Sequence, residues 1–286
     1  MIPKTGFRLA LVQAKTVQDK RTNVNAAAQA VRIARKRGAR VAALPECFSC
    51  PYDPSHFSQY AERIPEGQTS QSLSSIARES EIYLVAGTIP ELGADNKLYN
   101  SCTVWSPKGE LIATHRKLHL YDIDIPGQIP VKESSILSAG QTLTTFDVDG
   151  ICKIGIGICF DVRFAEMAQL YRDLGCQMLI YPGTFNMTTG PLHWRLLHRA
   201  RSVDNQVYVA AVSPARDTGA PYIAYGYSMV VDPWGRVIKC AGVDDEIIHA
   251  DIDLKTVEDF RNKVPVYKQR RTDVYETILK QTVKTS

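Results

Sequence analysis

Short apolar runs alternate with longer amphipathic segments along the chain. The runs are rich in valine, isoleucine, leucine and tyrosine and have the length of strands. They read FRLALVQA, RVAALPE, EIYLVAGTIP, NSCTVWS, ATHRKLHL, LTTFDV, CKIGIGICF, QMLIYPG, VYVAAVS, YGYSMVVDPWG and EIIHADID. Helical spacing of apolar residues predicts helices over residues 23–37, 68–79, 164–174, 192–205 and 254–262. This pattern is typical of an α/β protein.

The order of these elements predicts a mixed sheet, or two sheets, with helices outside. RLALVQA, a helix and VAALPE form a βαβ unit, whereas VYVAAVS leads into YGYSMVVD without a helix and predicts a hairpin. No repeat of fixed period and no linker rich in Pro, Gly and Ser divides the sequence, so we expect one domain over residues 1–286. Residues 121–140 lack clear periodicity, and a stretch of that length is often functional.

Composition narrows the class of protein. The chain is 44% hydrophobic and 22% charged, which is ordinary for a folded globular protein. A net charge of +4 is too small to indicate a nucleic-acid partner, and the basic run RIARKRGAR has the spacing of a solvated helix face. No run of about 18 apolar residues predicts a membrane span. Seven cysteines at irregular spacing favour a cytoplasmic location, with the mitochondrial matrix as the alternative.

Three strand ends carry reactive groups. VAALPE ends on Glu46, ATHRKLHL holds Lys117 near its end, and CKIGIGIC ends on Cys159. Functional groups in open α/β sheets gather beyond the carboxyl ends of strands. Cys159 lies where a buried strand turns into a predicted helix, and helix amides with a nearby cation lower a thiol's pKa. We therefore expect a reactive thiolate, the alternative being a cysteine that packs as a small hydrophobe.

Each of the other two groups also has a structural alternative. Glu46 ends an apolar strand, so it must be paired, hydrogen-bonded or shifted in pKa, as a general base or as part of a structural ion pair. Lys117 alternates with His115 and His119, which predicts one shared strand face, although a single lysine is more often a solvated edge residue. A lysine on the same face disfavours a metal site at the two histidines.

Other constellations compete with these three groups. Cys47 and Cys50 form a CxxC, which could serve redox exchange or half of a zinc site, but a second CxxC is missing. His193 or His198, on the helix predicted over residues 192–205, could pair with Cys159 as a dyad, although helix packing is the favoured interpretation. The glycines of GIGIC do not form GxGxxG, so no nucleotide cofactor is expected. Gly155 and Gly157 leave room for a backbone or a substrate.

Several longer blocks resemble one known family. They are LPECF, HRKLHLYDIDIPG, GIGICFDVRFAEMAQLY, YPGTFNMTTGPLHW, RARSVDNQVYV and SPAR, in this order along nearly the whole chain. Together they resemble the nitrilase superfamily of carbon-nitrogen hydrolases, most closely its omega-amidase branch. The resemblance implies a four-layer α-β-β-α sandwich that needs no cofactor and no metal. It also implies a homodimer, formed through the helix after the cysteine and a C-terminal tail of about residues 255–286.

The resemblance assigns roles to particular residues. By motif position the catalytic triad falls on Glu46, Lys117 and Cys159, and a supporting glutamate in the long loop falls on Glu133. The backbone N–H of Phe160 would stabilise the oxyanion together with Lys117. Four residues in or near the matched blocks are candidates for binding the substrate carboxylate: Tyr52, Arg163, Thr188 and Thr189.

The implied reaction is hydrolysis of the terminal amide of 2-oxoglutaramate or 2-oxosuccinamate to the 2-oxo acid and ammonia. An alternative keeps this chemistry on another amide, such as deaminated glutathione or an N-carbamoyl amine. An alternative of another class is a non-catalytic interaction protein on the same fold, which would be expected to have lost the triad. The chain departs from the family pattern at Tyr227, where a histidine is expected, and at Cys50, where a small polar residue is expected. Both departures concern substrate preference more than reaction type.

Overall fold

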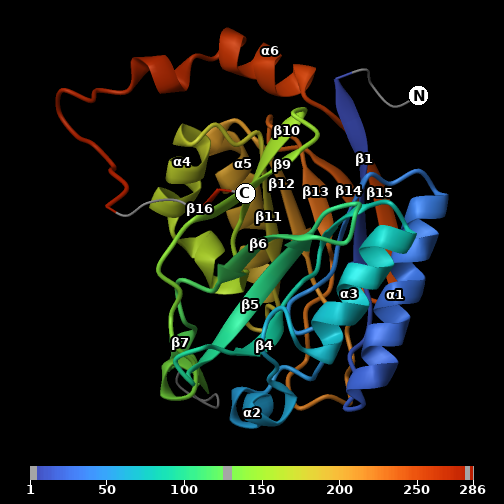
Figure 1. Cartoon of the computed structure of the whole chain (residues 1–286). Coiled ribbons are helices and arrows are strands. Elements are labelled where there is room, and N and C mark those ends of the chain that lie inside the picture. The colour runs from blue at the N-terminus through green and yellow to red at the C-terminus, as the bar shows by residue number, and fades with distance from the viewer. Residues whose placement is uncertain (1–4, 125–130, 281–283, 286) are drawn as a thin grey trace.

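Two β-sheets pack face to face, and helices cover their outer faces. The computed structural model describes residues 5–124, 131–280 and 284–285. Figure 1 shows α1 and α3 on one side of the strands and α4 and α5 on the other. This arrangement confirms the predicted four-layer α-β-β-α sandwich.

The first sheet has seven strands among the described residues, in the order β15-β1-β2-β3-β5-β4, with β6 also paired to β5. Strands β1, β2 and β3 are parallel, which confirms the βαβ unit, and the other pairs are antiparallel. The bounds are β1 Gly6–Gln13, β2 Val41–Ala43, β3 Tyr83–Val85, β4 Ile89–Leu92, β5 Leu98–Trp105, β6 Leu111–Arg116 and β15 Glu246–Asp253.

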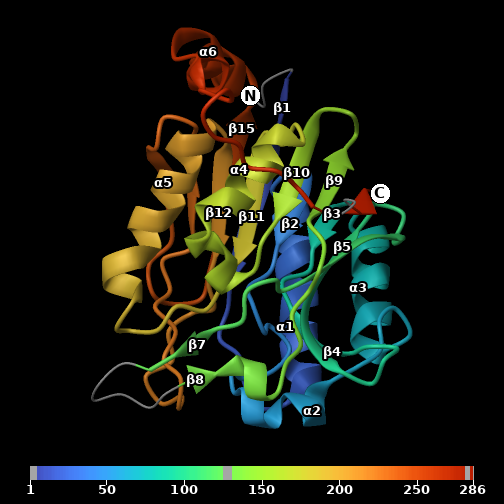
Figure 2. The ribbon, with the colours of Figure 1, turned by 90° about the vertical axis from the view of Figure 1, so that its left-hand side faces the viewer.

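The second sheet also has seven described strands, in the order β14-β13-β12-β11-β10-β9-β16. Its central strands β10, β11 and β12 are parallel, and β13 returns antiparallel as the predicted hairpin. Figure 2 shows the last strand, β16, beside β9. The bounds are β9 Thr144–Val148, β10 Cys152–Ile156, β11 Met178–Pro182, β12 Tyr208–Val212, β13 Met229–Val231, β14 Val237–Cys240 and β16 Lys284–Thr285.

The helices are amphipathic and lie close to their predicted ranges. The longest, α1, begins at Lys20 rather than at residue 23, because the Asp19 side chain accepts the N–H of Thr22 at 2.7 Å and caps it. The longer helices are α1 Lys20–Lys36, α3 Gln68–Glu79, α4 Ala165–Asp173, α5 Arg195–Asn205 and α6 Lys255–Lys263. Shorter elements are η1 Pro54–His56, α2 Phe57–Tyr60, η2 Glu133–Ser135, η3 Cys159–Arg163, η4 Gly190–Trp194 and η5 Val266–Gln269.

Two apolar cores follow from this layering. Fully buried side chains of both sheets, such as Leu9 and Leu11 of β1 and Ile154 and Ile156 of β10, fill the space between the sheets. A second cluster joins the first sheet to α1 and α3. Burying one such side chain contributes about 1.5–3 kcal/mol. The sheet interface is therefore held mainly by apolar packing, which has no direction of its own.

The long aperiodic stretch contains more structure than its sequence pattern predicted. Strands β7 (Asp122–Ile123) and β8 (Val131–Lys132) pair antiparallel, and η2 follows immediately. This hairpin and α2 lie at the end of the sandwich opposite α6 in both ribbon views (Figures 1 and 2). The segment thus contributes ordered residues next to the ends of β2, β6 and β10.

Two predicted strands differ from the structure, and one observed strand was not predicted. The run EIYLVAGTIP is two strands, β3 and β4, because Gly87 turns the chain with a φ of 54°. A side chain at Gly87 would lie 2.1 Å from the carbonyl oxygen of Pro45, so only glycine allows this approach. The run ATHRKLHL ends its pairing at Arg116, before Lys117. The mostly exposed edge strand β14 was not predicted, because VIKC is short and only partly apolar.

Candidate active site

The three predicted strand-end groups lie together at one end of the sandwich. Glu46 follows β2, Lys117 follows β6, and Cys159 opens η3 just after β10. Glu46 and Lys117 are 0% exposed and Cys159 is 6% exposed. Glu133, from η2, joins them. Residues from both sheets and from the long connection therefore form one buried cluster.

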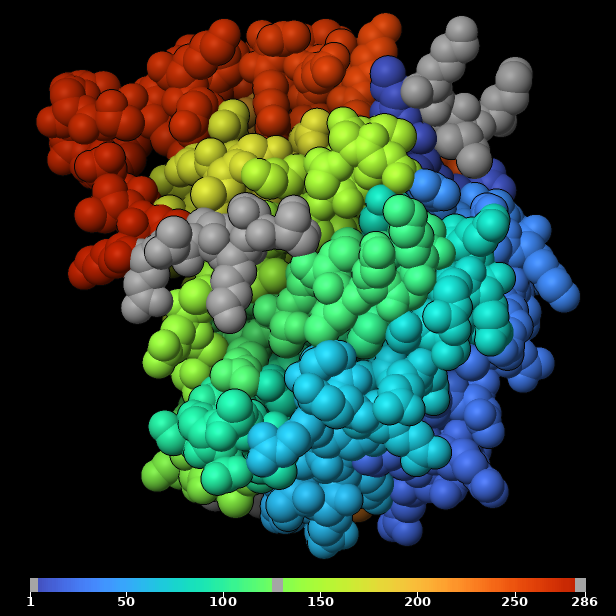
Figure 3. Space-filling view, viewed as in Figure 1, coloured from blue at the N-terminus to red at the C-terminus, as the bar shows by residue number. Residues whose placement is uncertain are grey.

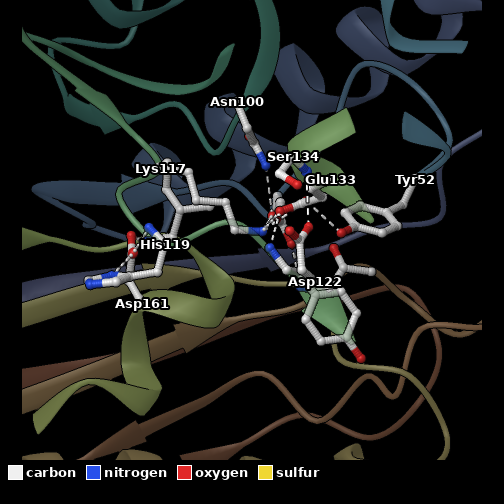
Figure 4. A network of polar contacts seen from close by, with 12 residues as sticks. Tyr52, Asn100, Lys117, His119, Asp122, Glu133, Ser134 and Asp161 are labelled. Atoms are coloured by element: carbon white, nitrogen blue, oxygen red, sulfur yellow. Dashed lines mark hydrogen bonds and ion pairs between the residues drawn. The ribbon is translucent and has the colours of Figure 1, made fainter. Parts of the chain in front are cut away.

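Lys117 carries the central charge of this cluster. Its Nζ lies 2.9 Å from the Glu133 carboxylate and 3.3 Å from Oε1 of Glu46 (Figure 4). Burial by itself would lower the pKa of Lys117, but the two carboxylates and Cys159 raise that pKa well above its usual 10.5. Lys117 is therefore a fixed ammonium at neutral pH.

Both oxygens of Glu46 accept hydrogen bonds. Asn100 Nδ2 donates to Oε1 at 2.8 Å, and the backbone N–H of Thr184 donates to Oε2 at 2.8 Å. The turn that carries Glu46 is fixed by Thr88, whose Oγ1 accepts the N–H of Cys47 at 2.8 Å. These contacts hold the carboxylate in one orientation.

Glu133 is fixed from two further directions. The hydroxyl of Tyr52 donates to its Oε1 at 2.6 Å, and the N–H of Tyr121 donates to its Oε2 at 2.7 Å (Figure 4). Tyr52 lies in the connection after β2, and Tyr121 lies between β6 and β7. The result is a carboxylate with a defined position beside Lys117.

Cys159 differs from the expected low-pKa thiolate. Burial raises the pKa of the Cys159 thiol well above its usual value, Glu46 raises it further, and Lys117 opposes the rise. The helix predicted over residues 164–174 is α4, which begins at Ala165, and the short 3-10 helix η3 lies between it and the strand that precedes Cys159. Cys159 has a φ of 47°, a strained conformation for a residue with a side chain. The thiol is protonated at rest and needs a base.

Two predicted open spaces are filled by side chains. A Cβ at Gly155 would lie 2.7 Å from the ring of Tyr171, and one at Gly157 would lie 2.4 Å from the ring of Tyr181. The room that these glycines leave is taken by tyrosine rings rather than by a second backbone or a substrate.

Three of the candidate substrate contacts, Arg163, Thr188 and Thr189, have partners within the protein. Arg163 packs over the rings of Phe160 and Phe185, with its guanidinium carbon 5.5 and 5.1 Å from their centroids, and its Nη1 lies 3.2 Å from Nδ1 of His193. Asn186 Oδ1 accepts the backbone N–H groups of the two threonines that follow β11, Thr188 at 3.1 Å and Thr189 at 2.9 Å.

A cavity of about 580 Å³ opens beside the cluster. Glu46, Tyr52 and Thr184 form part of its wall, and Tyr222 packs its ring 4.6 Å from that of Tyr52. No lysine or arginine is among the described residues that border it. Its volume suits a small organic molecule.

The competing histidine constellation has other partners. His198 Nδ1 lies 2.7 Å from the carbonyl oxygen of Trp194, and its ring packs edge-on against Trp194 and Tyr181. Burial lowers the pKa of His198 to about 4, so the ring is neutral. His193 contacts Arg163. These positions agree with the helix-packing interpretation.

Three further positions singled out in the sequence are the CxxC residues Cys47 and Cys50 and the departure from the family pattern at Tyr227. Cys47 and Cys50 are buried free thiols. Within the ranges that the structure describes, no group of three or more His, Cys, Asp and Glu side chains is placed to hold a metal ion. Tyr227 has a φ of 58° and packs against Tyr225, with 4.8 Å between ring centroids.

Sequence reasoning missed three positioning contacts. Asn100 and Thr184 orient Glu46, and Thr88 supports its turn. Thr184 lies in the block YPGTFN that carries the resemblance, but its contribution is a backbone N–H, which leaves no side-chain signal. Asn100 stands at the start of an apolar strand, where a buried amide needs partners.

A buried thiol, an oriented carboxylate and a fixed ammonium are the groups that a cysteine-dependent amide hydrolase requires. Comparisons with known proteins point the same way. The sequence profile of the carbon-nitrogen hydrolase family matches residues 8–262. The protein named "Omega-amidase NIT2" from Mus musculus is 54% identical over 269 residues, 94% of this chain and 96% of the relative. The Homo sapiens protein of that name is 51% identical over 276 residues, 96% of this chain and 99% of the relative.

A solved structure agrees with these sequence relatives. Saccharomyces cerevisiae Nit3, described as a member of branch 10 of the nitrilase superfamily, is 42% identical with a TM-score of 0.86. The match covers 95% of this chain and 100% of that chain. The protein belongs to the carbon-nitrogen hydrolase family and is an amide-hydrolysing enzyme, which confirms the resemblance seen in the sequence.

Replacing Lys117 tests the central ion cluster. Lys117→Met leaves Glu46 and Glu133 buried without their cation, so we expect the free energy of unfolding at pH 7 to fall by about 3–5 kcal/mol. Urea denaturation followed by circular dichroism measures this. Because the folded pKa of Lys117 lies above the unfolded value, its contribution is complete below about pH 10 and is lost as pH rises through the folded pKa. Lys239→Met, on the exposed strand β14, is the matched control and should change stability little.

Proposed function

We propose that this enzyme is an omega-amidase. It hydrolyses the terminal amide of small 2-oxo dicarboxylic acid monoamides, such as 2-oxoglutaramate and 2-oxosuccinamate, to the 2-oxo acid and ammonia. The names of the curated relatives support this substrate class. The observation that carries the proposal is the buried cluster of Glu46, Lys117 and Glu133 around Cys159.

In the first half of the reaction, Cys159 is the nucleophile and Glu46 the general base. Sγ attacks the amide carbon while Glu46 takes the thiol proton, which is needed because the thiol is neutral at rest. The bond between carbon and nitrogen then breaks, and Glu46 passes this proton to the nitrogen, which leaves as ammonia. The acyl group remains on Cys159 as a thioester.

The tetrahedral intermediate carries a negative oxygen that needs donors. Lys117 is a permanent ammonium in the cluster, and the backbone N–H of Phe160 follows the nucleophile directly. Each well-placed donor of this kind contributes about 2.7–4 kcal/mol to transition-state stabilisation. Glu133 holds the ammonium in place, so it supports the reaction without touching the reacting atoms.

In the second half, water replaces the leaving group. Glu46 takes a proton from water, the hydroxide attacks the thioester, and the thiol recovers its proton as the acid departs. Glu46 lines the cavity, which is the proposed route by which water arrives. No step in this cycle uses a cofactor or a metal.

Arg163 is the proposed contact for the far carboxylate of the substrate. Among the candidates it alone has a positive charge, and it lies four residues after Cys159 at the start of the segment leading into α4. Its Nη1 contacts a histidine rather than a carboxylate, so no described acidic group holds its charge. Tyr52, which lines the cavity, and the threonines Thr188 and Thr189 are the proposed hydroxyl contacts.

The assembly is proposed to be a homodimer in the cytoplasm. The sequence resemblance implied contacts through the helix after the cysteine, α4, but among the described residues α4 has no exposed large apolar side chain. We therefore propose α5 and the turn before it, where the residues of an apolar stripe, Leu192, Leu196 and Val203, are 68%, 62% and 42% exposed. The tail from about residue 255 exposes Val274, Tyr275, Ile278 and Leu279 and extends at the upper edge of the molecule in Figure 3. Apolar surfaces of this kind mark interfaces. All seven cysteines are free, as in a reducing compartment. In the described part of the chain, no helix is long and apolar enough to span a bilayer.

Ammonia release from a panel of amides tests the substrate class. Purified enzyme should release ammonia from 2-oxoglutaramate and 2-oxosuccinamate much faster than from glutamine, asparagine or an N-carbamoyl amine. Cys159→Ala should abolish release with an unchanged circular dichroism spectrum, and Glu46→Gln should lower kcat by about 10²–10⁴-fold.

Each rival predicts another result. Release only from the carbamoyl compound, or only from deaminated glutathione, would move the assignment to that amide. Activity of Glu46→Gln near the wild-type level, together with loss in a His193 or His198 variant, would establish a Cys-His dyad instead. No release from any amide would favour the non-catalytic protein.

Arg163→Gln should weaken binding of charged substrates selectively. We expect KM for 2-oxoglutaramate to rise about tenfold or more, since a hydrogen bond to a charged group is lost, while kcat changes less. A neutral amide such as butyramide should be hydrolysed as by the wild type. The exposed Arg195→Gln on α5 is the matched control. An equal loss on both substrates would exclude Arg163 as the carboxylate contact.

The dimer is tested by sedimentation equilibrium. Leu196→Glu puts a charge into the apolar stripe of α5, so the molecular mass should fall from twice 31.8 kDa to the mass of one chain. Gln71→Glu, which adds a charge to the exposed face of α3, should leave the mass unchanged. A wild-type protein that sediments as a monomer would contradict the proposal directly.

A further inference from the structure

Asp161 joins the two segments that carry Lys117 and Cys159. It lies two residues after Cys159 in η3 and is 0% exposed. Its carboxylate receives the N–H of Ile158 at 2.8 Å, which fixes the residue just before the nucleophile. Asp161 is thus anchored to the turn of Cys159 from within that turn.

The same carboxylate holds the chain on both sides of Lys117. The backbone N–H and Nδ1 of His119 lie 2.9 and 2.7 Å from Oδ1, and Nε2 of His115 lies 3.5 Å from Oδ2. Figure 4 shows the His119 ring turned to Asp161 while the Lys117 side chain runs toward Glu133. The expected common face of the three residues is therefore absent, because β6 ends at Arg116.

These contacts cross the interface between the sheets. Lys117 follows β6 of the first sheet, whereas Cys159 follows β10 of the second. His115 extends the link, because its Nδ1 lies 3.2 Å from Oγ1 of Thr144 in β9. Apolar packing between sheets does not set a position to a fraction of an ångström, but directional hydrogen bonds do.

The Asp161 carboxylate stays negatively charged although it is buried. Burial would raise the pKa of its carboxyl, but hydrogen bonds from His115 and His119 lower that pKa well below its usual range. An ionised carboxylate has two acceptor oxygens and can accept all of these hydrogen bonds at once. An amide has only one acceptor oxygen, so it could not.

We propose that Asp161 is a positioning residue that sets the placement of the Lys117 ammonium relative to the Cys159 thiol. It does not touch the reacting atoms. The inference rests on the proposed function, in which both groups act on one amide carbonyl. Displacement of reacting groups by about 1 Å can cost 10²-fold in rate without loss of binding.

Asp161→Asn tests this inference through a split between kcat and KM. On the amide that the wild type hydrolyses best, we expect kcat to fall about 10²-fold while KM stays within about threefold. Circular dichroism and thermal melting establish that the variant is folded. A folded variant with wild-type kcat, or one with only a raised KM, would overturn the proposal. Failure of the wild type on every amide would instead overturn the proposed function.

Two variants at His119 separate positioning from packing, even if Asp161→Asn does not fold. The His119 ring stacks on Phe164 at 3.5 Å between centroids. His119→Phe keeps this stacking and loses the Nδ1 donor, so kcat should fall about tenfold. His119→Asn places its amide nitrogen where Nδ1 was, so kcat should stay within about threefold of the wild type. The reverse order, or wild-type kcat in His119→Phe, would show that His119 only packs and would refute the proposal.

Discussion

One ammonium shared by two buried carboxylates is the interaction on which the site depends. Lys117 is buried completely, and an unpaired charge there would be costly. Glu46 and Glu133 compensate that charge, and each carboxylate is in turn held by neutral donors from other segments. Removing Lys117 would leave two buried carboxylates without a cation, whereas removing one carboxylate would leave the ammonium paired with the other. The cluster can therefore exist only in the folded chain, where β2, β6 and η2 meet.

The same cluster determines the state of the thiol. Burial disfavours the negative charge of a Cys159 thiolate, and the two carboxylates near it act in the same direction. A neutral thiol is a weak nucleophile, so the proposed chemistry requires a base within reach. Glu46 is the proposed base, and in this mechanism one carboxylate serves both attack and deacylation. The raised thiol pKa and the use of Glu46 as base follow from one electrostatic arrangement.

The residues of the site come from both sheets, and hydrogen bonds between the sheets hold them in place. Apolar packing brings the sheets together with a large free energy but sets their relative position only loosely. The N–H of Thr184, which follows β11, reaches across to Glu46 of the first sheet. Asp161 reaches across to the segment around Lys117. Polar contacts also join the sheets elsewhere, as between Arg40 and Asp149 and between Ser228 and Gln13, but those at Thr184 and Asp161 hold the segments that carry the site.

The sequence alone determined the layers, the family and the position of the reactive groups in the chain. Apolar runs and helical spacing predicted the central strands and the longer helices, whereas β7, β8, β16 and α2 were not predicted. Motif blocks in fixed order identified the family. The edge strand β14 was not predicted, because a short and partly polar strand has no clear pattern. The break at Gly87 was not predicted either, because that turn depends on a close approach to Pro45.

Only the tertiary structure decided how the groups behave. The sequence placed Cys159 at the turn between a strand and a helix, where a lowered thiol pKa was one of two interpretations. In the fold, burial and two carboxylates raise that pKa. Likewise, Asn100, the backbone N–H of Thr184 and the ties of Asp161 come from segments remote in sequence. The charge state of a buried group depends on its neighbours in space, and these are set by packing between the sheets rather than by any local pattern.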